Sequence, residues 1–463
     1  MKQSVLFLFL FFTQWVQAND LLLKNFQIID PASERAFSGH ISVNGEVIVG
    51  IYPVGTQGLQ AKKIIEGNGR WLLPGFHDMH LHNTTGNTPP YGAFDPKFHD
   101  FTSQEKIGHR LLYSGVTTYL DLGAPSEAGE LKGGGGDNPE DIFGLRKKQQ
   151  KRKILHPHLF AAGPLWIVPG SHPMADADWA QREVIRVETE KSGKAIPTKE
   201  VVLWARQRVE TLVKGFRPNV IKFIYDNPHG EPFADRTHQM PIEVAQALIE
   251  EAAKYGIKSV AHVGSWKAVR ELSELGVSAI THLPMGEPTK EVTDAMLKSG
   301  TVAITTMAVI ADFGDMKDDL KRNQFVENLL FKVLTPVRFA RTYLDYDLYS
   351  DKDKKWVEWA SGQNQLKGQE KALMGLARAG VPILSGSDGV NSGSVYGYSL
   401  HRELVRMKLA GLDSWSILRT TTSAPAQFLG ATSGQIQEGA LANFVILKSD
   451  PVLDIENTQD IDR

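Results

Sequence analysis

A regular alternation of two kinds of segment through the middle of the chain places the strongest constraint on the fold. Short runs rich in β-branched and aromatic residues are separated by stretches with helical periodicity, such as residues 241–257 and 266–277. Eight of these β-rich runs occur, at residues 75–82, 116–123, 158–164, 219–225, 258–264, 278–284, 302–308 and 382–388. Eight parallel strands that are each followed by a helix close into a TIM barrel. The pattern therefore predicts an α/β fold of the (β/α)8 kind, with its active site at the carboxyl ends of the strands.

Both ends of the chain show a different pattern, of short strands and turns. It covers residues 21–30, 40–52 and 62–74, where Asn44-Gly45 is a hairpin signal, and it returns at residues 434–455. We predict that the two ends pair into one small β-sandwich domain. The predicted division of the chain is a signal peptide at 1–18, the small β domain at 19–73 and 429–463, and the (β/α)8 barrel at 74–428.

Residues 1–18 have the features of a secretory signal peptide. Lys2 precedes an apolar run at residues 5–12, and Val16-Gln17-Ala18 fits small-residue cleavage. The alternative is an uncleaved membrane anchor, but the run is shorter than the ~20 apolar residues that span a bilayer. We expect an exported protein that starts near Asn19, has no stable membrane insertion and, because it also lacks cysteine, resides in a bacterial periplasm.

Charge and composition narrow the class of partner and the kind of metal ligand. The chain has 51 Lys and Arg against 53 Asp and Glu, and neither sign forms a long block, which argues against nucleic-acid binding. A small-molecule substrate is the expected partner, while the oligomeric state, a homo-oligomer included, stays open. The absence of cysteine excludes disulfides and thiolate zinc sites, and it leaves histidine, carboxylate and lysine as the strong metal ligands.

Two segments are longer than an ordinary connection between a strand and a helix. Residues 126–139 include four consecutive glycines, Gly133 to Gly136, and predict a mobile loop. Residues 311–365 mix charges with several aromatic residues. This insertion is either a helical lid over the site or a subdomain that packs on its own aromatic side chains.

Ionisable side chains occupy the strands of the predicted barrel. His80 and His82 lie two residues apart, so a strand directs both imidazoles to one face, where they can bind one ion together. Alone, such a pair is better explained by packing or surface exposure. However, Lys222 lies within a later apolar run, and His262, His282 and Asp388 end others. Because burial of an unpaired charge is costly, these placements together indicate a binding site.

These motifs resemble the amidohydrolase superfamily, in particular its branch of imidazolonepropionase-like proteins and carboxylated-lysine Xaa-Pro dipeptidases. The similar segments are 74–82, 115–123, 158–164 with 169–172, and 434–447, and the resemblance extends over nearly all of the chain after the signal peptide. His77 departs from the family, where an apolar or aromatic residue is usual, and we expect its side chain to point away from His80. Asn443 stands where aspartate is common. The resemblance also leads us to expect one more β strand of the small domain beyond Arg463, as if this domain were truncated.

The resemblance implies a binuclear metal centre. Zinc is the expected ion, with manganese, cobalt or iron as alternatives. The implied ligands are His80, His82 and Asp388 for the first ion and His262 and His282 for the second, with Lys222, carboxylated by carbon dioxide, as the bridge. The alternative for Lys222 is a buried ion pair with an acidic neighbour.

The chemistry that such a centre implies is hydrolysis by a metal-activated hydroxide. Asp388 would accept the proton of the water and deliver it to the leaving amine. His172 is expected to hydrogen-bond the carbonyl oxygen in the transition state, or else is a plain loop histidine. Tyr225 is a weaker candidate for substrate binding, with wall packing favoured. His401, Arg402 and Glu403 follow the eighth run as supporting helix residues.

The leading functional hypothesis is therefore hydrolysis of a carbon-nitrogen bond, in a dipeptide, an N-acyl amino acid or a cyclic amide. The first alternative is a mononuclear, imidazolonepropionase-like or deaminase-like hydrolase, in which Lys222 stays uncarboxylated, His262 joins the first site and His282 contacts substrate. A non-catalytic barrel explains the ligand set poorly. A lactone or phosphoester hydrolase with the same site stays open, because the loops around a barrel determine its substrate.

Overall fold

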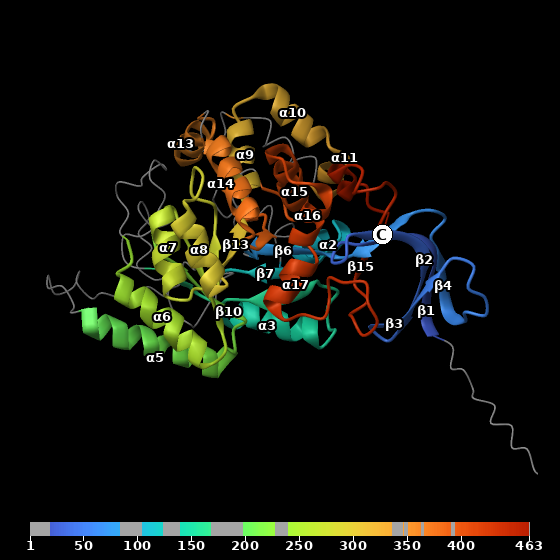
Figure 1. Ribbon diagram of the computed structural model, residues 1–463, viewed down its shortest axis with the longest axis horizontal. Coiled ribbons are helices and arrows are strands. Elements are labelled where there is room, and N and C mark those ends of the chain that lie inside the picture. The colour runs from blue at the N-terminus through green and yellow to red at the C-terminus, as the bar shows by residue number, and fades with distance from the viewer. Residues whose placement is uncertain are drawn as a thin grey trace, which may run out of the picture.

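The computed structural model describes residues 19–83, 104–123, 139–167, 198–226, 239–335, 346, 351–362, 365–389 and 394–462. Strands run through the interior of a large body whose helices lie outside them, and a smaller lobe of strands from the N-terminal segment lies at one end (Figure 1). The predicted signal peptide, the glycine loop at 126–138 and His172 lie outside the described residues. In the part of the chain that is described, no helix combines the length and apolar character that a membrane span needs.

Each of the eight β-rich runs in the middle of the chain contains a strand. These strands are β6 (Phe76–Leu81), β7 (Val116–Asp121), β8 (His158–Ala161), β10 (Val220–Ile224), β11 (Lys258–His262), β12 (Ala279–Thr281), β13 (Val302–Thr305) and β14 (Ile383–Ser385), with a short additional strand β9 (Leu165–Trp166) after β8. They pair in parallel as one sheet in the order β6-β7-β8 and another in the order β14-β13-β12-β11-β10-β9. The fold is therefore α/β.

Two junctions connect the two parallel sheets. Only residues 162–164 separate β8, which pairs with β7, from β9, which pairs with β10. At the other junction, Leu81 forms a parallel bridge with Gly389, and the backbone N–H of Asp388 donates to the carbonyl of His80 at 2.7 Å. The first strand therefore lies beside the segment that follows the last strand.

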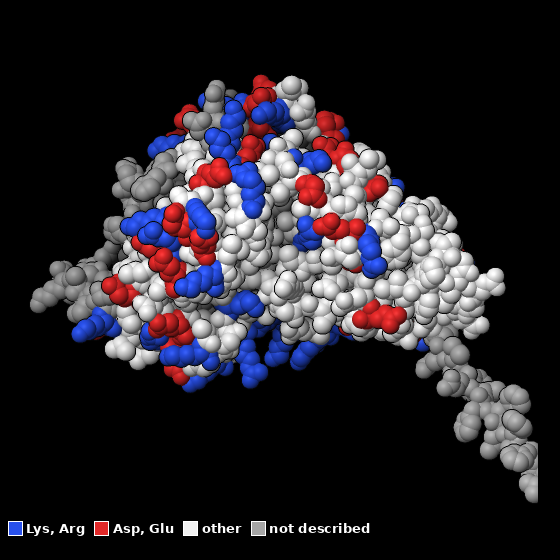
Figure 2. Space-filling model, viewed as in Figure 1, with Lys and Arg blue, Asp and Glu red and all other residues white. Residues whose placement is uncertain are grey.

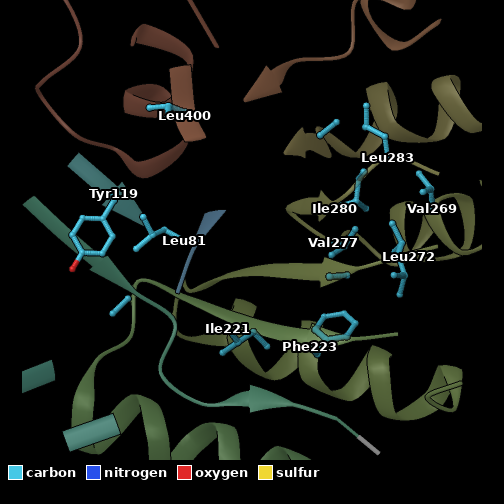
Figure 3. Packing of buried hydrophobic residues seen from close by; sticks show 14 of the residues in the cluster. Leu81, Tyr119, Ile221, Phe223, Val269, Leu272, Val277, Ile280, Leu283 and Leu400 are labelled. Carbon is cyan, nitrogen blue, oxygen red and sulfur yellow. The ribbon is translucent and has the colours of Figure 1, made fainter. Parts of the chain in front are cut away.

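Helices follow the strands and cover them with apolar faces. They are α2 (Gln104–Tyr113), α3 (Pro139–Gln150), α5 (Thr198–Phe216), α6 (Ile242–Lys254), α7 (Trp266–Glu274), α8 (Lys290–Ser299), α14 (Gln365–Ala379), α15 (Tyr398–Ala410), α16 (Ser414–Thr420) and α17 (Ser423–Leu429). In α7, Val269 and Leu272 are buried and belong to the same core cluster as Ile221 and Phe223 of β10 (Figure 3). Burial of each such side chain contributes about 1.5–3 kcal/mol to the stability of the fold. This packing holds in place the strand ends that carry the site.

The insertion at 311–365 is mostly helical where it is described. It includes most of α9 (Met307–Asp315), all of α10 (Asp319–Glu327), α11 (Leu329–Leu334) and α13 (Asp351–Ala360), and the start of α14. Phe313, Phe331 and Val357 form an apolar cluster of their own, against which Trp359 and Tyr346 pack. The cluster also contains Tyr398 of α15, so the insertion is anchored on the helix that follows the last strand.

Strands from both ends of the chain form a separate six-stranded sheet. Its members are β1 (Asn19–Asp30), β2 (Arg35–Asn44), β3 (Val47–Pro53), β4 (Ala61–Glu66), β5 (Trp71–Pro74) and β15 (Phe444–Leu447), and β15 pairs antiparallel with β5. A short 3-10 helix, η4 (Ile455–Gln459), follows. Asn44 pairs with Val47, so the hairpin turn is Gly45-Glu46, one residue later than predicted, and Gly45 has the positive φ of 59° that the turn requires.

Candidate metal centre

His80 of β6 and His82, which directly follows this strand, converge on the carboxylate of Asp388 in the turn after β14. The Nε2 atoms of His80 and His82 lie 3.2 Å apart, and each lies 3.3 Å from Oδ1 of Asp388. The strand alternation brings both imidazoles to one face, and the parallel junction between His80 and Asp388 brings the carboxylate to them. Three electron-rich atoms at this spacing repel one another unless a proton or a cation lies between them.

This triangle of ligand atoms fits a tetrahedral metal ion. Ligand atoms placed about 2.0 Å from zinc in a tetrahedron are separated by about 3.3 Å. The three separations of 3.2, 3.3 and 3.3 Å between His80, His82 and Asp388 match this edge length. The residues therefore fit a divalent ion in both chemistry and spacing.

Two further histidines lie against this triangle. His282 follows β12, and its ring centroid lies 4.9 Å from that of His80 and 4.4 Å from that of His262, which ends β11. One ligand atom each from His80, His282 and Asp388 lie within 4.8 Å of one another. His282 and Asp388 also have positive φ angles of 67° and 50°, a strained conformation that is typical of functional positions.

Lys222 occupies the middle of β10 and is 1% exposed. Its Nζ donates a hydrogen bond of 2.6 Å to the hydroxyl of Thr281, at the end of β12. Within the described residues, no carboxylate lies at ion-pair distance from Nζ. Burial lowers the pKa of Lys222 to about 7, although the negative charge of Asp388 opposes this effect. A substantial fraction of the lysine is therefore neutral near neutral pH.

The protonation states of His80 and Asp388 also favour the binding of a cation. Burial lowers the pKa of His80 well below its ordinary value, and nearby positive charges lower it further. For Asp388, burial acts to raise the pKa, but the hydrogen bond from His82 and the surrounding positive charges outweigh it, and the pKa lies below its ordinary value. Neutral imidazoles and an ionised carboxylate are the forms that bind metal ions.

Several buried side chains that the sequence analysis did not single out hold these groups in place. The carboxylate of Asp78, also on β6, accepts hydrogen bonds from the backbone N–H and the hydroxyl of Ser387. Asp121, at the end of β7, accepts from the backbone N–H of Asn83, and the hydroxyl of Tyr396 donates to the carbonyl of His82. Asp78 follows the same two-residue alternation as His80, which is the signal that could have identified it.

The other candidate residues lie apart from this cluster or outside the described residues. The hydroxyl of Tyr225 donates to Glu271 of α7 at 2.9 Å, and its ring lies in the apolar core. His77 is buried, and its Nε2 lies 3.0 Å from the hydroxyl of Ser433. His401 bonds the carbonyl of Ser114 and the hydroxyl of Thr458. Nothing is described for His172.

Charged side chains of both signs are mixed on one face of the molecule. Lys and Arg are interspersed with Asp and Glu on the face shown (Figure 2). The chain has a formal net charge of −2.

Comparisons with known proteins identify relatives over most of the chain. The model of the Amidohydrolase family matches residues 71–462. A Xaa-Pro dipeptidase solved with bound methionine in its active site is 19% identical, with a TM-score of 0.68 over 96% of this chain and 97% of that chain. A putative prolidase from Bifidobacterium longum is 20% identical, with a TM-score of 0.69 over 96% and 92% of the two chains. At these identities the likeness shows the fold.

Two further matches are to proteins with other names. The ochratoxinase of A. niger is 16% identical, with a TM-score of 0.63 over 96% of this chain and 94% of that chain. An adenine deaminase from Desulforamulus reducens is 41% identical over 63 residues, which are 14% of this chain and 10% of the deaminase. The match therefore spans about a tenth of the length of that curated relative.

Proposed function

This chain belongs to the amidohydrolase family, and on that premise we propose that it is an exported, metal-dependent hydrolase that cleaves a carbon-nitrogen bond in a small substrate. The observation that carries the proposal is the convergence of His80, His82 and Asp388, whose ligand atoms have the separations of a tetrahedral site. Such spacing of three ionisable groups, of which His80 and Asp388 are buried, serves no packing purpose.

The chain offers ligands for a pair of ions. His80, His82 and Asp388 would hold the first ion, and His262 with His282 the second. Lys222 in carboxylated form would link the two, and its burial and lowered pKa support this role because only a neutral amine reacts with carbon dioxide. Zinc suits this oxygen and nitrogen ligand set best. When bound, such ions lower the pKa of water and polarise the carbonyl group under attack.

Asp388 has the properties of a proton carrier in the reaction. Its carboxylate is ionised, because its pKa lies below the ordinary value, and it contacts both His80 and His82. It accepts a proton from water as the water attacks, and it then delivers that proton to the leaving nitrogen. His172 remains the candidate donor to the carbonyl oxygen.

We also propose how the barrel closes, what the small domain is and where the protein is located. The strands close into a (β/α)8 barrel, which is supported by the parallel pairings and by the bridge between Leu81 and Gly389. The sheet built from both ends belongs to a small β-sandwich domain. Residues 1–18 are a signal peptide that directs the protein to the periplasm. Dipeptides with proline in the second position lead the substrate list, because the Xaa-Pro dipeptidase and the prolidase share this fold over nearly their whole length.

Two observations favour a second candidate, a mononuclear hydrolase of the deaminase kind. One ligand atom each from His80, His282 and Asp388 lie within 4.8 Å of one another, close enough to share a single ion, and a 63-residue segment is 41% identical to an adenine deaminase. In that case Lys222 stays a free amine that donates to Thr281. Metal stoichiometry distinguishes the two candidates.

The test is a hydrolysis panel on metal-depleted protein before and after zinc is restored. Xaa-Pro dipeptides, N-acyl amino acids, cyclic amides and adenine are offered in turn. We expect zinc to restore cleavage of an amide substrate and Asp388→Asn to lower kcat by about 10²–10⁴-fold. Asp294→Asn is the matched control, since Asp294 pairs with Lys290 on the surface of α8. Equal rates with and without zinc, or an unaffected Asp388→Asn variant, would refute the proposal.

A further inference from the structure

The helix that follows β13 begins without the cap that its sequence provides. Thr306 is the N-cap residue of α9, and threonine at this position normally accepts a hydrogen bond from the first turn. Here the side chain of Thr306 makes no cap hydrogen bond. Because Thr306 is only 1% exposed, water does not replace the missing partner. Its hydroxyl is therefore engaged elsewhere.

That hydroxyl lies against a candidate metal ligand. Oγ1 of Thr306 is 2.7 Å from Nδ1 of His282. An imidazole that binds a metal through Nε2 carries its hydrogen on Nδ1 and needs an acceptor there, which fixes both the tautomer and the ring orientation. Thr306 supplies that acceptor from the neighbouring strand end, next to β13.

A carboxylate from another helix caps α9 in place of Thr306. Oε2 of Glu403, on α15, accepts from the backbone N–H of Ala308 at 2.6 Å, and Met307 also donates to this carboxylate. Glu403 is 0% exposed, and burial raises its pKa to about 7, although the N–H groups of the first turn of α9 favour its ionised form. The first-turn N–H groups of α9 are thus satisfied without the threonine side chain.

We propose that Thr306 is a positioning residue for His282, and that Glu403 makes this possible by capping α9 in its stead. The proposal rests on the metal-binding function proposed above. Thr306 holds His282 as the Nδ1–H tautomer, so that Nε2 faces the ligand cluster as a lone-pair donor. Without Glu403, the hydroxyl of Thr306 turns back to the open N-terminus of α9 and releases the imidazole.

Zinc affinity, measured by competition with a chromophoric chelator, tests the role of Thr306. Thr306→Val keeps the shape and removes the hydroxyl, and loss of such a supporting hydrogen bond lowers metal affinity by about 10–100-fold. Thr306→Ser keeps the hydroxyl and should bind zinc like the parent. Thr301→Val is the matched control, because Thr301 is equally buried and donates to the carbonyl of Val277, away from the site.

A second pair of variants tests the role of Glu403. Glu403→Ala opens the N-terminus of α9 and should weaken zinc binding although Glu403 contacts none of the candidate ligands. Glu403→Gln retains an acceptor oxygen for the N–H of Ala308 and should restore the affinity of the parent. Equal zinc affinity in Glu403→Ala and the parent would overturn this part of the proposal.

The tautomer is read directly by NMR of protein labelled with 15N-histidine, in the metal-free state. The parent should show His282 with its hydrogen on Nδ1, and Thr306→Val should lose this fixed tautomer. If the parent binds zinc and Thr306→Val binds it equally well, or if Thr301→Val weakens binding as much, the inference fails and the proposed function stands. If the parent binds no zinc, the proposed function fails, and the tautomer of His282 in the two metal-free proteins still decides whether Thr306 positions it.

Discussion

The carboxylate of Asp78 accepts two hydrogen bonds from Ser387, one from its backbone N–H at 2.9 Å and one from its hydroxyl at 2.6 Å. Asp78 lies two residues before His80 on the first strand, and Ser387 lies immediately before Asp388. The pair therefore ties the strand that carries the histidines to the turn that carries the carboxylate. Both residues are fully buried, so water cannot substitute for either bond.

Removing the hydroxyl of Ser387 should weaken this link between β6 and the turn that carries Asp388. In Ser387→Ala one carboxylate oxygen of Asp78 loses its partner, which we expect to lower the free energy of unfolding by about 1–3 kcal/mol. Zinc affinity should fall by about 10–100-fold, because Asp388 is then less firmly placed. Ser385→Ala is the control, since Ser385 is equally buried but donates to the carbonyl of Thr420. Equal zinc affinities in the two variants would contradict this role of Asp78.

Removing the hydroxyl of Tyr225 should affect stability and leave catalysis unchanged. Its hydroxyl donates to Glu271 of α7, so Tyr225→Phe should lose about 1 kcal/mol of unfolding free energy. Neither kcat nor KM for the best substrate of the panel should change. A rise in KM with unchanged stability would restore Tyr225 as a substrate-binding residue.

A buried histidine should make stability depend on pH. Burial lowers the pKa of His401 to about 4 from an ordinary value of 6.5. Between these two values the unfolded chain binds more protons than the folded one, so the free energy of unfolding falls as the pH drops from about 6.5 to about 4. For this single group the loss approaches roughly 3 kcal/mol.

Denaturant unfolding at pH 7 and at pH 4.5 measures this contribution. His401→Gln should lose less stability between these pH values than the parent, because glutamine does not titrate. His109→Gln, at an exposed position of α2, should behave like the parent. An identical pH dependence in His401→Gln and the parent would show that His401 does not cause it.

The strands, and which of their side chains share a face, could be predicted from the sequence, because both depend on local periodicity. Each β-rich run contains a strand, and the alternation along 76–81 directs His80 and its neighbours to one face. The same alternation argues against Tyr225, which is three residues after Lys222 and therefore on the opposite face of β10. The structure agrees, since Tyr225 contacts helix α7.

The residues that support the ligands could not be predicted, because their partners are distant in the sequence. Ser387 lies 309 residues from Asp78, and Glu403 lies 95 residues from the N–H group that it caps. A threonine at position 306, directly before a helix, indicates an ordinary N-cap. Only the packing of α15 against α9 shows that Glu403 caps this helix instead. Tertiary packing thus overrides the local preference of this threonine.

The decisive measurement for the proposed metal centre is the metal content per chain of the purified protein, in the parent and in Lys222→Ala, each prepared with and without bicarbonate. We expect a pair of divalent ions per parent chain, and the loss of one or both in Lys222→Ala whether or not bicarbonate is present. A single ion in both proteins would support the mononuclear candidate. A parent protein that takes up no divalent metal would refute the metal centre and the hydrolase proposed from it.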